Sequence, residues 1–169
     1  MIFLNLLFNV VLWHEDFVND NLSVQQLYEY TVDIRMEEGN LQLRGNPGAE
    51  GFSCAWFYLD DSIQLTEDDL IEMRIKVTGV ETRLKYLYKK KGSPIYWGQE
   101  IIVYTDTDWQ KIRIPLKQAR PFYSSNFPFA LTPDKTPTLY FFIDNFTPGN
   151  FDTKIDYISI IKPNTIKEE

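Results

Sequence analysis

The 169-residue chain contains a single cysteine, Cys54, and a single histidine, His14. One cysteine excludes an intrachain disulfide, although the lack of disulfides does not exclude export. Cys54 lies in an apolar run, which favours a small core residue over a nucleophile. A thiol nucleophile needs a base, so a Cys54–His14 pair stays open, but nothing in the spacing indicates one.

Enzyme signatures are also scarce. The sequence lacks a Gly-x-Ser-x-Gly elbow, a phosphate-binding glycine loop and a histidine-rich metal motif. Glycoside hydrolysis needs only two carboxylates, and Asp60-Asp61 and Glu67-Asp68-Asp69 could supply them. Both groups stand in turn-like contexts, where acids usually cap or solvate. The sequence therefore predicts no catalytic residues and a protein that is not an enzyme.

Positive charge is sparse as well. The net charge is −7 and the pI is about 4.8, which argues against nucleic acid or an anionic membrane as partner. The basic cluster at 89–91 reads as a solvated hairpin tip. Met1–Trp13 is apolar but too short to span a bilayer, and it lacks a basic start and a cleavage site. It is either a first strand or the remnant of an export segment.

What the chain has in abundance is strand-forming sequence. Hydrophobic residues make up 44% and aromatic residues 15% of the chain. Gly, Pro, Asn and Asp recur at intervals of roughly 10–15 residues, a spacing typical of an all-β sandwich. We expect one domain over 1–163 and a flexible tail over 164–169. The expected strands are Val10–Phe17, Asp33–Met36, Asn40–Arg44, Ser53–Leu59, Leu70–Thr78, Thr82–Lys89, Glu100–Tyr104, Trp109–Leu116, Leu139–Asp144 and Lys154–Ile161.

Two segments depart from this pattern. Ser23–Tyr30 has weak helical spacing and is the one helix candidate. Lys117–Pro137 contains four prolines and cannot be a central strand throughout. It is expected to be an ordered loop, either bordering a ligand site or covering an open end of the core.

Aromatic side chains favour ligand binding over catalysis. Carbohydrate rings present C–H patches that stack on flat aromatic faces, while their hydroxyls need charged or amide partners. For any one of these aromatics a place in the core is favoured over ligand contact, since such residues dominate interior packing. Trp97, between Pro94 and Gly98, is expected in a loop and is balanced between ligand contact and packing. The candidate ligand-binding residues are Trp56, Tyr58, Arg83, Tyr86, Tyr88, Trp97 and Glu100.

Asp156 is the one acid within an apolar closing strand, where an unpaired carboxylate is costly. Glu15 and Asp16 stand in a similar apolar setting near the start of the chain. First and last strands are often neighbours in a sandwich, so we expect these acids to meet. Asp156 is therefore either a solvent-facing edge residue or a ligand held for a purpose.

Four motifs resemble the galactose-binding-domain-like jelly rolls, especially carbohydrate-binding modules of bacterial glycan-degrading enzymes. They are Glu15-Asp16-Phe17 with Gly39-Asn-Leu41-Gln-Leu43, Thr107-Asp-Trp109-Gln-Lys-Ile-Arg-Ile-Pro115-Leu116, Leu139-Tyr-Phe-Phe-Ile143 with Pro148-Gly149, and Ile155-Asp156-Tyr-Ile-Ser-Ile160. The resemblance implies a structural Ca²⁺ held by Glu15 or Asp16 and by Asp156, with oxygen ligands only. It does not carry a glycan specificity to this sequence.

The expectation is an all-β jelly-roll β-sandwich of two antiparallel sheets that binds an oligo- or polysaccharide without catalysis. The resemblance implies an extracellular or cell-surface bacterial protein that works beside a catalytic domain or in a surface complex. No nucleic acid and no membrane span are expected. Two alternatives stay open: a glycan-active hydrolase of β-sandwich fold, and a structural or protein-interaction domain of a larger protein.

Overall fold

The computed structural model describes residues 9–17, 24–26, 32–45, 53–59, 64–90, 95–106, 108–122, 139–145 and 149–163. For residues 24–26, 32–34, 53–59 and 140–145 it describes the backbone alone. The described residues contain twelve strands and one short 3₁₀ helix, η1 (Leu116–Gln118). None of them forms a helix long and apolar enough to cross a membrane.

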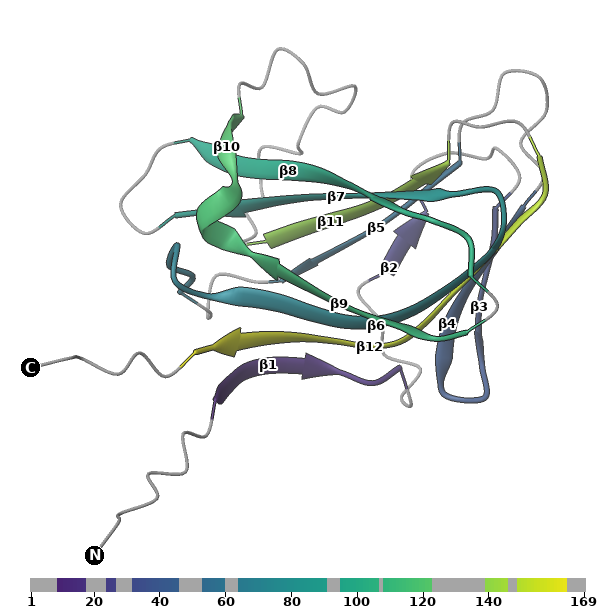
Figure 1. The fold of residues 1–169 in the computed structure, drawn as a ribbon, viewed down its shortest axis with the longest axis horizontal. Coiled ribbons are helices and arrows are strands. Elements are labelled where there is room, and N and C mark those ends of the chain that lie inside the picture. The colour runs from purple at the N-terminus through teal and green to yellow at the C-terminus, as the bar shows by residue number, and fades with distance from the viewer. Residues whose placement is uncertain are drawn as a thin grey trace, which may run out of the picture.

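The strands form two antiparallel sheets that face each other (Figure 1). The order in sheet A is β3 (Val32–Glu37), β4 (Asn40–Gly45), β12 (Phe151–Lys162), β6 (Leu70–Gly79) and β9 (Gln110–Pro115), and β1 (Val10–Glu15) also pairs with β12. The order in sheet B is β10 (Arg120–Phe122), β8 (Tyr96–Val103), β7 (Thr82–Lys89), β11 (Leu139–Asn145), β5 (Ser53–Leu59) and β2 (Val24–Gln26). The predicted β-sandwich is confirmed, whereas the jelly-roll connection stays a prediction.

Alternation along the strands places the core between the two sheets. Ile71, Met73 and Ile75 of sheet A face Leu84 and other buried residues of sheet B, and all are at most 2% exposed. Thr82 of β7 and Thr153 of β12 are also buried, and their hydroxyl oxygens lie 2.7 Å apart. This hydrogen bond joins the sheets and satisfies two buried hydroxyls that would otherwise destabilise the core.

The first and last strands lie side by side, as the sequence predicted. β1 pairs antiparallel with β12, from Val10 opposite Lys162 to Glu15 opposite Ile158. Beyond Glu15, Phe17 is 2% exposed and belongs to the core. His14 Nδ1 and Ser159 Oγ lie 2.7 Å apart on the outer side of this strand pair. The two ends of the domain are therefore tied together in one sheet.

Several boundaries differ from the prediction. The helix expected at Ser23–Tyr30 is wrong over its described part, because Val24–Gln26 forms β2 and pairs with β5. Trp97, expected in a loop, lies inside β8, which begins at Tyr96. Of the expected loop at 117–137, residues 117–122 continue η1 and form β10, while 123–137 lie outside the described residues.

The turn from sheet A to sheet B depends on Gly79. Its φ is +90°, and a Cβ at this position would lie 1.9 Å from the backbone oxygen of Asn150. A side chain would therefore meet both backbone strain and a steric clash that no rotamer can relieve.

We expect Gly79→Ala to lower the free energy of unfolding by roughly 2–4 kcal/mol, because strain and overpacking add at this site. Chemical denaturation measures the change. Thr78→Ala, one residue earlier, is the control and should cost under about 1 kcal/mol, because the Thr78 hydroxyl makes only a 3.4 Å hydrogen bond to Asp152 O. Equal stability of Gly79→Ala and the original chain would contradict the assigned constraint.

Candidate functional site

The face of sheet B that is turned away from sheet A carries Arg83 and Glu100, the two charged ligand-binding candidates. Along β7, Leu84, Tyr86 and Tyr88 are buried on the core side, while Arg83 and Lys85 on the other side are half-buried. Leu87, farther along that other side, is buried as well. Directly paired residues of neighbouring strands lie on the same face. Lys85 pairs with Glu100 and Arg83 pairs with Ile102 of β8. These four side chains therefore share the outer face of sheet B.

Glu100 links two cations of β7. Its carboxylate oxygens lie 3.7 Å from Arg83 Nη1 and 3.3 Å from Lys85 Nζ. The three side chains are about a third or more exposed, so the ion pairs are solvent-screened and contribute little stability. Their arrangement fixes two donors and one acceptor at the surface, which suits recognition of hydroxyl groups.

Exposed apolar side chains adjoin this polar trio. Ile102 is 43% exposed, and Tyr104, the residue after β8 ends at Val103, is 69% exposed. The buried Val103 stands between them, so the exposed positions continue the alternation of β8. An aromatic ring this accessible, two residues beyond the strand partner of Arg83, is available to stack on a ligand.

The register extends this face toward Trp56 and Tyr58. Lys85 is paired with Phe142 of β11, and Phe142 is paired with Trp56 of β5. Two residues along, Tyr140 of β11 is paired with Tyr58. The side chains of Trp56 and Tyr58 lie outside the described part of the chain, so the backbone register alone places these positions in line with Lys85 and its neighbours.

The other three aromatic candidates belong to the opposite face. Tyr86 and Tyr88 are each 1% exposed and form part of the core. Burial raises the pKa of Tyr86, and its hydroxyl donates to Gln99 Oε1 at 3.4 Å. Trp97 pairs with Tyr88 and packs against the core, with Lys90 Nζ 5.5 Å from its ring centre. Packing, the alternative given for each of these residues, describes them better than ligand contact.

The sequence contained a signal for this division. Leu84, Tyr86 and Tyr88 stand at every second position of the strand, so they share one face, and Arg83 and Lys85 lie on the other. Ile102 and Tyr104, by contrast, had no distinguishing signal, because their exposure depends on where β8 lies in the sheet. At Gly98 of β8, a Cβ would lie 2.3 Å from Leu87 Cδ2, so the side chain of Leu87 occupies the space beside this glycine.

Asp156, the acid of the closing strand, lies at an irregularity. The pairing of β12 with β6 shifts between Ile155 and Tyr157, so Asp156 is the extra residue of a β-bulge. Its Oδ2 accepts a hydrogen bond from Arg74 Nη1 at 2.7 Å, and the Arg74 guanidinium lies 4.9 Å from the Trp109 ring centre. The Asp156 carboxylate, which would destabilise an apolar strand if it were unpaired, is therefore paired with a cation.

Glu15 and Asp16 lie at the end of β1, close to the part of β12 that contains Asp156, but they make different contacts. Glu15 stands opposite the core-facing Ile158, and its Oε1 accepts from the Phe17 amide at 3.0 Å. Asp16 is exposed. Their oxygen atoms are of the type calcium prefers, but the Arg74 guanidinium already neutralises Asp156. No group of three or more His, Cys, Asp or Glu side chains suited to a metal ion occurs within the described residues. The calcium site stays a prediction.

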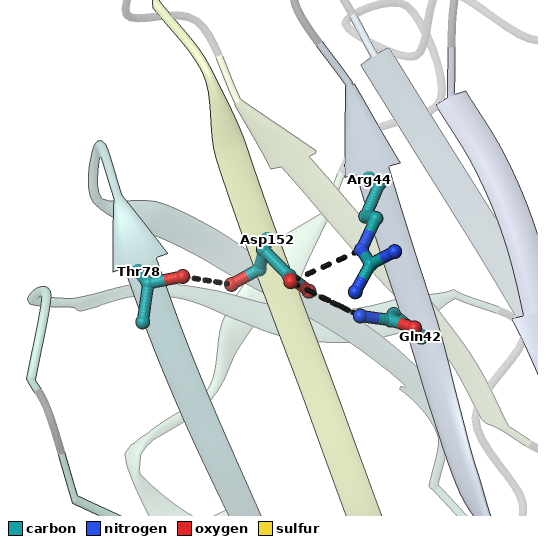
Figure 2. A network of polar contacts seen from close by, with 4 residues as sticks. All are labelled: Gln42, Arg44, Thr78 and Asp152. Atoms are coloured by element: carbon teal, nitrogen blue, oxygen red, sulfur yellow. Dashed lines mark hydrogen bonds and ion pairs between the residues drawn. The ribbon is translucent and has the colours of Figure 1, made fainter. Parts of the chain in front are cut away.

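The outer face of sheet A carries ion pairs and polar networks. Asp152 accepts from Gln42 Nε2 at 2.9 Å and from Arg44 Nε at 3.1 Å, and its backbone oxygen accepts from Thr78 Oγ1 at 3.4 Å (Figure 2). These four residues come from β4, β12 and β6, so the network crosses three strands. It stabilises the register at one end of the sheet.

Glu72 forms the second network on this face. Its side chain is only 8% exposed and accepts from Arg113 Nε at 2.7 Å and Tyr157 Oη at 3.0 Å, with Lys111 Nζ 2.8 Å away. Burial alone would raise the pKa of Glu72, but the hydrogen bonds from Lys111, Arg113 and Tyr157 outweigh it and lower this pKa. The hydrogen bond to Glu72 in turn raises the pKa of Lys111.

We expect Glu72→Gln to lower the free energy of unfolding at neutral pH by about 1–3 kcal/mol, the range for hydrogen bonds to charged groups. A lowered folded-state pKa means that the contribution is complete above the ordinary value of 4.5 and is lost as the pH falls through the lowered value. Denaturation curves at several pH values should therefore converge in acid. Glu37→Gln, at an exposed acid of β3, is the control, and a pH-independent difference for Glu72→Gln would contradict the assignment.

The fold is similar to that of solved carbohydrate-binding modules. The family 11 carbohydrate-binding module of the cellulosomal cellulase Lic26A-Cel5E of Clostridium thermocellum matches with a TM-score of 0.61 and 15% identity, covering 96% of this chain and 99% of that one. The same organism's family 11 module in complex with a β-1,3-1,4-mixed-linked tetrasaccharide matches with a TM-score of 0.57 and 16% identity, covering 86% and 94%. The apo form of BiXyn10A CBM1 matches with a TM-score of 0.56 and 13% identity, covering 92% and 99%.

A scan of protein-family models and a search of curated proteins both return no match. At these identities the structural likeness shows the fold alone. The chain has the two-sheet fold of these modules over nearly its whole length.

Proposed function

We propose that this chain binds a polysaccharide, without catalysis, through the outer face of sheet B. The observation that carries the proposal is the combination of exposed Ile102 and Tyr104 with the Arg83–Glu100–Lys85 trio on one face. Apolar rings and paired hydrogen-bonding groups are what a sugar surface requires from a protein.

Each part of this face has a distinct role in the proposed complex. Tyr104 stacks on a sugar ring, and Ile102 packs against its C–H surface. Arg83 and Lys85 donate to hydroxyl oxygens, while Glu100 accepts from hydroxyl groups. Each hydrogen bond replaces one to water, so the net gain per contact is small and affinity depends on several sugars binding together.

The fold supports this proposal independently of the side chains. Three solved structures of modules with this fold match over 94–99% of their own length, and one of these structures contains a mixed-linked tetrasaccharide. The match to whole modules suits a domain that works as one unit. Trp56 and Tyr58, in register with Lys85 and its neighbours, complete the proposed surface.

Location and context belong to the same proposal. A polysaccharide ligand suits an extracellular or cell-surface protein of a bacterium, acting beside a catalytic domain or in a surface complex. One of the similar modules comes from a cellulosomal cellulase, which supports that context. A glycan-active hydrolase is the competing function, and it would need a second carboxylate near Glu100.

We expect Tyr104→Ala to weaken glycan binding roughly 10-fold, because one stacked ring is worth about 1–2 kcal/mol. A glycan array identifies the best ligand, and isothermal titration then compares the variants. Ile102→Ala should weaken binding less, since it removes apolar contact without an aromatic face. Val11→Ala is the matched control, because Val11 is 57% exposed on β1 of the other sheet.

Three results would contradict the proposal. They are no binding to any glycan, an equal loss with Val11→Ala, or release of reducing sugar that stops with Glu100→Gln. The last result would replace binding by hydrolysis.

Calcium at the junction of β1 and β12 stays part of the proposal, supported by the pairing of the two strands. If Ca²⁺ joins Glu15 or Asp16 to Asp156, EDTA should lower the melting temperature, because an ion that binds only the folded state stabilises it. Asp156→Asn should remove that EDTA effect. A melting temperature unchanged by EDTA in calcium-loaded protein would contradict the proposed calcium site, and the ion pair with Arg74 would then account for Asp156.

A further inference from the structure

One end of the sandwich, where β7 ends, β8 begins and β9 leads into η1, holds two buried polar atoms without partners (Figure 1). Asp69, directly before β6, is 1% exposed, and its Oδ2 accepts from Thr66 N at 2.7 Å and from Thr66 Oγ1 at 3.0 Å. Asp69 Oδ1 and Trp97 Nε1 are both buried, and neither has a hydrogen bond within the described residues. Packing accounts for the ring of Trp97 but not for its Nε1. Buried polar atoms are almost always satisfied, so an unmatched acceptor and an unmatched donor at one end of the core indicate a missing group.

A series of contacts brings these two atoms to the same place. Trp97 of β8 is paired with Tyr88 of β7. The Tyr88 hydroxyl donates to Leu116 O at 3.5 Å, and the Leu116 amide donates to Asp69 O at 3.0 Å. Burial, and after it the negative charges of Glu67 and Asp69, raise the pKa of Tyr88, as expected for acids near its hydroxyl. Trp97 and Asp69 therefore both lie next to Tyr88.

An exposed ion pair stands at the solvent side of these contacts. Lys90 Nζ binds the Glu67 carboxylate and lies 5.5 Å from the ring centre of Trp97. The Lys90 and Glu67 side chains are 36% and 55% exposed, so solvent screens the pair and its opening costs little. On the inner side, Leu65 and Leu116 are at most 1% exposed and belong to the core. We call Glu67, Asp69, Lys90 and Trp97 the end site.

The two unpartnered atoms select a ligand that both donates and accepts. A hydroxyl group can donate its proton to Asp69 Oδ1 and accept from Trp97 Nε1. A cation would face the N–H group of Trp97, and an anion would face the carboxylate of Asp69, so neither is matched to both atoms. The pair of atoms is therefore complementary to the hydroxyl of a sugar.

We propose that the end site binds the terminal sugar of a glycan, separately from the outer face of sheet B. The inference rests on the proposed function for its ligand class and adds a second site. One sugar hydroxyl bridges Asp69 Oδ1 and Trp97 Nε1 after the Lys90–Glu67 pair has opened. Because the core lies behind the site, a glycan chain cannot pass through it, so the site takes a chain end. The outer face of sheet B, by contrast, is open to sugars within a chain.

The indole N–H signals provide a direct test. The chain has four tryptophans, so proton–nitrogen correlation NMR gives four such signals, and Trp97→Phe identifies that of Trp97. The probes are glucose, galactose, mannose and xylose, followed by the tetrasaccharide and the soluble polysaccharide of whichever sugar acts. We expect the Trp97 signal to shift saturably with at least one monosaccharide. At equal mass of sugar the shift should decrease with chain length, because longer chains have fewer ends.

The variants assign the shift to the end site. Asp69→Asn should weaken sugar binding roughly 10-fold, because it replaces a charged acceptor by a neutral amide. Lys90→Gln does not alter the two buried atoms and serves as a second variant if Asp69→Asn fails to fold. It should tighten binding about two- to fivefold, because the exposed ion pair no longer has to open. Lys89→Gln is the matched control, because it removes the same charge from the other side of β7 and should change nothing.

The outcomes separate the end site from the outer face. A Trp97 shift that persists in Tyr104→Ala and is weakened by Asp69→Asn supports the end site. Loss of the shift in Tyr104→Ala, no shift with any sugar, or an equal effect of Lys90→Gln and Lys89→Gln overturns the inference. Glycan binding at the outer face would then stand, and a water molecule would account for the two buried atoms. No binding of any glycan, by NMR or by array, overturns both proposals.

Discussion

The pairing of β12 with three other strands is the constraint on which sheet A depends. β12 pairs with β6 along most of its length, with β4 over residues 151–155 and with β1 over residues 158–162. The change of partner from β4 to β1 coincides with the bulge at Asp156. A bulge increases local twist, so the same strand can serve two partners on one edge. The first and last segments of the domain are thereby held in one sheet.

The core that β12 helps to form determines which residues remain for a ligand. Ile155, Ile158 and Ile160 of β12 are buried, and they require an apolar surface on the facing sheet. Sheet B supplies it with Leu84, Tyr86 and other residues of the same face. Tyr86 and Tyr88 are therefore part of the core and do not face a ligand. Arg83 and Lys85 alternate with the core-facing residues of β7 and face outward, and this is why we propose ligand binding at these two residues and their neighbours.

The sequence predicted what depends on local pattern and missed what depends on distant partners. Ser53–Leu59 and Thr82–Lys89 were correct to the residue, because alternation and turn residues define strands locally. The helix expected at Ser23–Tyr30 failed because a short helix is marginal without packing, and pairing with β5 favours a strand. Arg74 lies 82 residues from Asp156, so nothing local could reveal their pairing.

For charge, too, the composition gives the total, whereas the fold determines where each charged side chain lies. The net charge of −7 says how the whole molecule interacts with a distant polyanion, and at long range it repels one. At physiological salt, however, screening acts over about 8 Å, so a ligand in contact with one face responds mainly to the charges of that face. Contact with a ligand therefore depends on which side chains one face presents, such as Arg83, Lys85 and Glu100 on sheet B, and not on the net charge of the chain.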